Sequence, residues 1–157
     1  MPINKKLLAV CILIPLAVGG VSALLTSSAM QTFESLDQPP LSPPGWLFPI
    51  VWTILFLLMG IASYLVVTSD APQPERRRAL RVYAIQLAFN FLWSIVFFNL
   101  GWYLFAFVWL LALLGLILLN GVLFFRIRKA AGYLLLPYLL WCTFAAYLNM
   151  GIYLLNR

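Results

Sequence analysis

The ionisable side chains of this sequence are few, and they lie where they cannot act together inside an apolar segment. The four carboxylates all fall in polar connections between apolar runs: Glu34, Asp37, Asp70 and Glu75. The chain has no histidine, the commonest general base and metal ligand. Its two cysteines, Cys11 and Cys142, lie far apart in apolar runs and show no metal-ligand spacing. We therefore expect no acid–base or hydrolytic site, no metal site and no cofactor.

Aromatic and amide side chains remain as candidates for a binding site or for redox chemistry at tryptophan. Several recur at intervals that place them on one face of a helix. These sets are Trp52 with Phe56; Gln86, Asn90 and Trp93; and Trp141, Ala145 and Asn149. Each set points in one direction, so we expect the three faces to meet at a common centre.

The same residues also have structural interpretations. An amide inside an apolar run must face the bundle interior, where it either bonds helices together or contacts a ligand. For Asn90 both interpretations stand, whereas for Gln86 and Asn149 we favour interhelical hydrogen bonding. Tryptophans commonly lie in the interfacial belt of a membrane or take part in ordinary packing, and Trp102 and Trp109 fit one of these structural roles.

Composition places the chain in a membrane. Of its 157 residues, 64% are apolar and 9% are charged, which leaves too few charges to cover a water-soluble domain. A bilayer core of about 30 Å needs about 20 apolar helical residues. We predict an all-α membrane protein, a bundle of five transmembrane helices forming a single domain over residues 1–157. The expected spans are residues 7–28, 46–68, 80–99, 103–125 and 132–155.

Basic residues predict the orientation of this bundle. The net charge is +6, and the positive side chains cluster beside apolar runs at positions 5–6, 76–81 and 126–129. That pattern is typical of cytoplasmic loops and anionic lipid headgroups, and we expect no nucleic-acid partner. It predicts a cytoplasmic N-terminus and an external C-terminus, and the short ends favour a bacterial cell membrane. The first apolar run has an alternative interpretation as a cleaved signal peptide, for which it is long.

One connection, residues 31–45, is longer than a turn between helices requires. Long loops in compact domains are usually functional or disordered. Four prolines stiffen this one, since each fixes φ: Pro39, Pro40, Pro43 and Pro44. We expect it to form a lid. Trp46, directly after the loop, fits either a ligand contact or the interfacial belt.

Three segments together resemble the TspO/translocator family of tryptophan-rich membrane proteins. Residues 39–52, PPLSPPGWLFPIVW, are similar to its proline-rich loop and the following helix. Residues 86–98, QLAFNFLWSIVFF, are similar to its third helix, and residues 137–149, PYLLWCTFAAYLN, to its fifth. Order and spacing match from about residue 33 to residue 149. The loop departs from the family, because Thr32, Gln38 and Leu41 stand where the family has tryptophan, lysine and tryptophan.

The resemblance implies a receptor, sensor or carrier that binds porphyrins, and in some members sterols or drug-like molecules, in an aromatic pocket. The ligand-binding residues it implies here are Phe33, Pro43, Pro44, Trp46, Trp52, Phe56, Asn90, Trp93, Trp141 and Ala145. Bacterial relatives pair through the third helix, where Ala84 and Ala88 form a small-residue pair, so we expect a homodimer. Leu148, Tyr153 and Arg157 fit a loose sterol pattern to which we give almost no weight.

Other functions stay open. Family members have been linked to porphyrin breakdown, and such an enzyme would use Trp52 and Trp141 in oxidative or light-dependent chemistry. A facilitated transporter of the same ligands also fits, whereas ion-coupled transport needs a mid-membrane charge or a broken helix. A structural subunit would only pack its aromatic faces. We favour a ligand-binding sensor or carrier.

Overall fold

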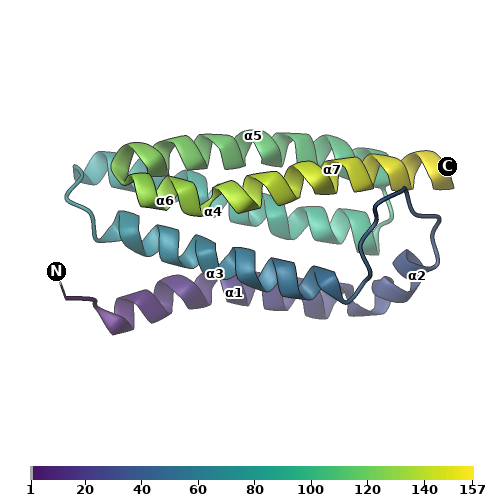
Figure 1. Cartoon of the computed structure of the whole chain (residues 1–157), viewed down its shortest axis with the longest axis horizontal. Helices are drawn as coiled ribbons and strands as arrows, with labels where there is room; N and C mark the ends of the chain where they lie inside the picture. Colours follow the sequence, from purple (N-terminus) through teal and green to yellow (C-terminus); the bar gives the residue numbers. More distant parts are fainter. Residues whose placement is uncertain (1) are drawn as a thin grey trace.

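The computed structural model describes residues 2–157, and within that range the regular structure is entirely helical (Figure 1). In chain order the elements are α1 (Lys5–Thr26), the 3-10 turn η1 (Ser27–Ala29), α2 (Met30–Glu34), α3 (Leu47–Val67), α4 (Gln73–Ser94), the π-helical η2 (Ile95–Asn99), α5 (Tyr103–Ile127), α6 (Lys129–Leu134) and α7 (Leu136–Asn156). Five continuous stretches of these helices are long and apolar enough to cross a bilayer. The predicted fold class is confirmed.

The helices pack in a ring in which each touches its neighbours. α1 lies along α3, α3 contacts α6, α5 packs on α6 and α7, and α4 packs on α5 and returns to α1. Figure 1 shows the N-terminus at one end of the bundle, with the loop before α3 and the C-terminus at the other. The start of α1 and the α3–α4 and α5–α6 connections share the N-terminal end, so nine of the ten basic residues gather there.

Local chemistry sets the helix ends. The Asn4 side chain accepts a hydrogen bond from the backbone N–H of Leu7 at 3.1 Å and so caps α1. Gly101 adopts a φ of 65°, which glycine tolerates without strain, and this turns the chain sharply from η2 into α5. Arg128 is extended, with φ −146° and ψ 125°, and it separates α5 from α6.

The first loop begins later than the sequence predicted. The expected span ended at residue 28 and the expected lid began at residue 31, but helical turns continue through η1 and α2 to Glu34. The backbone N–H of Ser35 closes this last turn on the Gln31 carbonyl at 3.2 Å. No glycine or proline occurs between Gly20 and Pro39 to stop the helix earlier. The lid therefore consists of residues 35–46.

The third and fifth spans also extend beyond their predicted limits. α4 begins at Gln73 rather than residue 80, so the arginine-rich segment is helical, and Pro74 and Glu75 occupy its first turn. The Arg76 guanidinium donates to the Val67 carbonyl at 3.1 Å and satisfies the end of α3. The last span begins at Lys129 as α6 and breaks near Pro137, which lacks a backbone N–H. Hydropathy marks where a helix leaves the apolar run, not where its backbone hydrogen bonds end.

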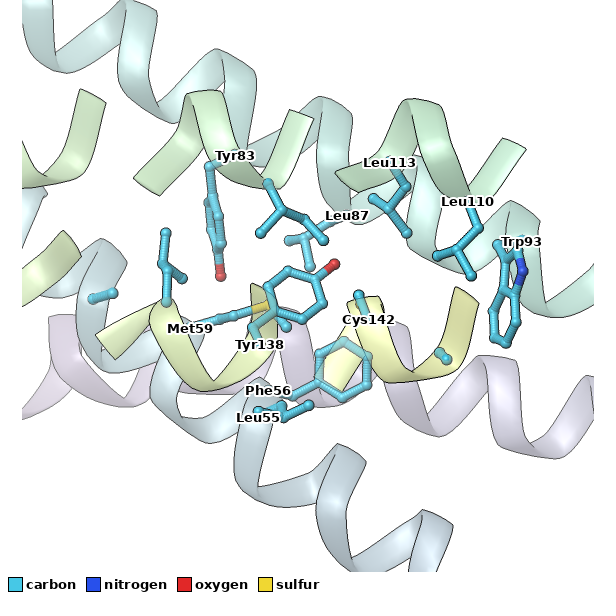
Figure 2. Packing of buried hydrophobic residues seen from close by; sticks show 14 of the residues in the cluster. Leu55, Phe56, Met59, Tyr83, Leu87, Trp93, Leu110, Leu113, Tyr138 and Cys142 are labelled. Carbon is cyan, nitrogen blue, oxygen red and sulfur yellow. The ribbon is translucent and has the colours of Figure 1, made fainter. Parts of the chain in front are cut away.

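Close backbone contact joins α1 to α3. A Cβ on Gly60 would lie 2.6 Å from the Ile12 Cα and 2.7 Å from the Cys11 carbonyl oxygen, so only glycine fits there. Deeper in the bundle, Figure 2 shows Tyr138 of α7 in the centre of a buried cluster, between Met59 of α3 and Leu87 of α4. This packed half of the bundle supports the more open half that holds the candidate site.

Candidate functional site

A cavity of about 350 Å³ lies in the half of the bundle next to the lid. Its wall comes from the C-terminal part of α1, the α2 segment, the N-terminal part of α3, the end of α4 with η2, and α7. α5 supplies no lining residue among those described, because it packs behind α4 and α7. The cavity volume falls within the range of about 300–1,000 Å³ typical of small-molecule sites.

Most of the predicted ligand-binding residues lie on this wall. The seven that line the cavity are Phe33, Trp52, Phe56, Asn90, Trp93, Trp141 and Ala145. They come from four separate helices, so the faces deduced from helical spacing do meet in space. That they contact a ligand stays a prediction.

Three predicted residues, Pro43, Pro44 and Trp46, lie outside the cavity wall. Trp46 precedes α3 and is 68% exposed. Two residues later in the chain, Phe48 lines the cavity in its place, together with Pro49. The step of about 100° per residue places Trp46 and Phe48 on different sides of the helix start.

Helix α1 contributes wall residues that sequence reasoning missed. Gly19, Ser22, Ala23 and Thr26 line the cavity. Gly19 and Ala23 have no polar side chain, and the hydroxyls of Ser22 and Thr26 are bonded within the protein. A Cβ at Gly19 would lie 2.5 Å from the Phe56 ring, so the missing side chain makes room for that ring. The run of small residues on α1 was the available signal, since such residues let helices or ligands approach closely.

Aromatic rings cover most of the wall. Trp52 stacks on Phe56, with ring centroids 5.6 Å apart and planes at 29°. Trp93 stacks on Phe97 at 5.2 Å and 23°. Phe33 closes the lid end, where it lies 6.2 Å from Phe48, 5.8 Å from Phe97 and 5.2 Å from Phe98. Such surfaces suit a flat apolar molecule that can stack on them.

One buried hydrogen-bond chain reaches the cavity through Asn90. The Tyr138 hydroxyl donates to Gln86 Oε1 at 2.6 Å and accepts from Asn90 Nδ2 at 2.8 Å. Gln86 Nε2 ends the chain on the Met59 sulfur at 3.8 Å. No described residue donates to the Asn90 side-chain oxygen, which leaves an acceptor beside the cavity.

Asn149 performs the interhelical role predicted for it. Its side-chain oxygen accepts from the Trp93 indole N–H at 3.1 Å, and its amide donates to the Tyr103 carbonyl at 2.8 Å. These bonds join α4, α7 and α5 and fix the Trp93 ring against the cavity. The Trp109 indole N–H donates to the Phe89 carbonyl at 2.9 Å, which joins α5 to α4.

Side-chain hydrogen bonds tie the lid to α7. The Tyr147 hydroxyl donates to the Pro40 carbonyl at 2.6 Å. Asn156 exchanges two hydrogen bonds with the Asp37 backbone, at 3.0 and 2.9 Å. A Cβ on Gly151 would lie 2.6 Å from Pro39, so the lid packs directly on the helix. These contacts hold the lid across the end of the bundle (Figure 1).

Comparison with known proteins places the chain among relatives of matching length. The model of the TspO/MBR family matches residues 11–155. The tryptophan-rich protein TspO of Chlorobaculum tepidum is 40% identical over 156 residues, covering 98% of this chain and 99% of that protein. The tryptophan-rich sensory protein of Cereibacter sphaeroides is 36% identical over 126 residues, covering 80% of this chain and 77% of that protein. The translocator protein of Ovis aries is 35% identical over 142 residues, covering 85% of this chain and 79% of that protein.

Proposed function

We propose, from the premise that the chain belongs to the TspO/MBR family, that it is a membrane receptor or sensor that binds porphyrins and similar flat apolar ligands. The chain is an integral membrane protein, on the evidence of its five spans and its relatives. The observation that carries the proposal is the aromatic cavity, which is lined by tryptophan and phenylalanine from four helices.

The wall chemistry supports this ligand class. Among the residues that the structure describes, none on the cavity wall is charged, so a ligand's buried part must be largely apolar. The stacked pairs at Trp52 and Trp93 present broad ring faces. A porphyrin with carboxylate substituents fits if those groups point toward the lid end, where they stay near water. The Asn90 oxygen adds one acceptor for a ligand donor.

Orientation and assembly are further parts of the proposal. The basic end of the bundle is cytoplasmic, which puts the lid and the cavity on the outer side of a bacterial cell membrane; the charge asymmetry supports this. Two copies pair through α4 at Ala84 and Ala88. Both alanines are exposed on the surface of the single chain, on the side away from the buried Gln86 and Asn90.

Fluorescence quenching of the purified protein by protoporphyrin IX tests the binding. We expect saturable quenching, and we expect Trp52→Phe and Trp141→Phe to weaken it about two- to tenfold, the worth of one aromatic contact. Trp102→Phe is the matched control, because Trp102 is 57% exposed and lies outside the cavity. Linear quenching in all four proteins would mean partition into detergent and would exclude the porphyrin site.

The same titration separates binding from breakdown. The porphyrin absorbance is followed in the dark and under light. A stable spectrum in the bound state supports a receptor, whereas loss of the spectrum in the native protein but not in Trp52→Phe or Trp141→Phe would reassign the protein as an enzyme.

A further inference from the structure

The cavity wall includes residues that are also exposed on the outer surface of the bundle. Ala23 and Ser27 of the α1 segment and Pro49 of α3 line the cavity and are exposed. Two contacts fix how α1 and α3 lie against each other: Gly60 meets Ile12, and Phe56 meets Gly19. α1 and α3 run in opposite directions (Figure 1), so the register set by these two contacts brings Ala23 and Ser27 level with Trp52 and Pro49. The cavity therefore reaches the surface between α1 and α3.

The other sides of the cavity are closed by specific contacts. On its α4 edge, α1 is tied by the Ser22–Ser94 hydroxyl pair at 2.5 Å and by Asn99 Nδ2, which donates to the Leu25 carbonyl at 3.0 Å. At the end of the bundle the lid is bonded to α7 through Tyr147. Between α3 and α7, the Trp141 ring separates the cavity from an apolar outer groove.

The Trp141 ring fills the space between α3 and α7 and so closes that side of the cavity. It packs against Phe48 on the cavity side, at 5.9 Å, and against Phe144 on the groove side, at 5.6 Å. Phe48 lines the cavity and Phe144 lines the groove. A ligand passing there would have to displace a ring held from both sides, whereas the α1–α3 edge needs no such movement.

The opening faces lipid, close to one membrane surface. Its rim residues, Ala23, Ser27 and Pro49, are uncharged. Trp46 and Trp102 are both exposed and directly precede α3 and α5, which begin at the same end of the bundle (Figure 1), as expected of an interfacial belt. Pro49 follows Trp46 by three residues, about 5 Å along the helix. The opening thus lies just inside the interface, where flat molecules with one polar edge collect.

We propose that the ligand reaches the cavity sideways from the bilayer, through an opening between α1 and α3 bounded by Ala23, Ser27 and Pro49. This inference rests on the proposed binding function but concerns the route, which that function does not specify. A flat apolar ligand partitions into lipid before it binds, so the lid need not open. Obstruction of the opening slows association and dissociation together, whereas a change that acts only on the bound state alters the dissociation rate alone.

The test uses the full chain in lipid nanodiscs and measures the rates of protoporphyrin IX binding and release by stopped-flow fluorescence. We expect Ala23→Phe to slow both rates about tenfold, because a ring at the rim must move aside at each passage. Ala17→Phe is the matched control, since Ala17 is exposed on the same helix and lies outside the cavity wall. It should leave both rates unchanged.

Two further variants test the competing routes. Tyr147→Phe removes the hydroxyl that holds the lid, and Leu140→Phe fills the outer groove, which Leu140 lines at 63% exposure. Neither should change the rates. Faster exchange in Tyr147→Phe would show that ligand passes the lid, slower exchange in Leu140→Phe would show passage beside Trp141, and either result would overturn the α1–α3 opening.

If porphyrin does not bind saturably, that result refutes the proposed function but not the route. A second probe then tests the route by itself. Ala145→Cys places a thiol on the cavity wall, and its reaction with an apolar maleimide dissolved in the nanodisc lipid is followed against the parent protein, whose Cys11 and Cys142 are buried. Ala23→Phe should slow this labelling about tenfold relative to Ala17→Phe. Equal labelling in the two backgrounds would exclude the opening.

Discussion

Replacement of Tyr138 by phenylalanine should destabilise the bundle, because one buried hydroxyl serves two amides. Tyr138 is 1% exposed and Gln86 is 0% exposed, so no water replaces the lost partner. The variant leaves Gln86 Oε1 and Asn90 Nδ2 without their 2.6 and 2.8 Å bonds. Hydrogen bonds between membrane helices average about 0.6 kcal/mol each, and a buried unsatisfied group costs about 1–3 kcal/mol. We expect a loss of about 1–3 kcal/mol in the free energy of unfolding.

Denaturant unfolding in a fixed detergent, followed by circular dichroism, measures this loss. Tyr147→Phe is the matched control: it removes a hydroxyl bonded to the Pro40 carbonyl at the exposed lid, and it should cost less than about 0.5 kcal/mol. The reasoning is refuted if the two variants cost the same. It also requires coupling, so Tyr138→Phe should cost less in a Gln86→Leu background, where one of the two amides is gone.

Three further predictions concern packing, orientation and assembly. Gly60→Ala should lower the free energy of unfolding by about 1–3 kcal/mol in the same assay, because its Cβ would meet the Ile12 backbone. Gly115→Ala is the control and should be neutral or stabilising, because open space surrounds Gly115. Equal effects of the two changes would contradict the close α1–α3 contact. A cysteine at position 35 in place of Ser35 should react with an impermeant maleimide from outside intact cells, and labelling only after permeabilisation would reverse the orientation. Ala88→Trp should convert a dimer to a monomer in sedimentation experiments in detergent, and an unchanged dimer would place the interface elsewhere.

The fold was predictable because a bilayer imposes few choices. Each apolar run had to become a helix of membrane length, since backbone groups in lipid must be bonded internally. The same logic could not locate the ends of helices outside the apolar core. The segment from Gln73 to Arg81 is polar yet helical, and the turns through Glu34 continue because nothing in the sequence interrupts them. Hydropathy does not indicate where a helix ends once it continues into water or the interface.

The candidate site was predictable where side chains carry a chemical signal. Trp52, Asn90 and Trp141 are conspicuous in an apolar run, and helical spacing indicates which way they face. Gly19 and Ala23 carry no such signal, because their contribution is the space they leave. A single sequence shows which residues can contact a ligand more readily than it shows where the wall is thin enough to admit one.

Three of the buried amides, Gln86, Asn90 and Asn149, show how the structure divides supporting roles from binding roles among residues of similar chemistry. Gln86 and Asn149 each use both polar groups on the protein, so neither retains a group for a ligand. Asn90 uses only its amide nitrogen among the described residues, and its oxygen stays beside the cavity. In the proposed site, discrimination between ligands would come mainly from ring shape and stacking, with the Asn90 oxygen adding a preference for a molecule that presents one donor. The proposed site, a broad aromatic wall with few polar groups, accepts a class of flat molecules rather than a single one, which suits the proposed receptor better than an enzyme that must position a substrate at several points.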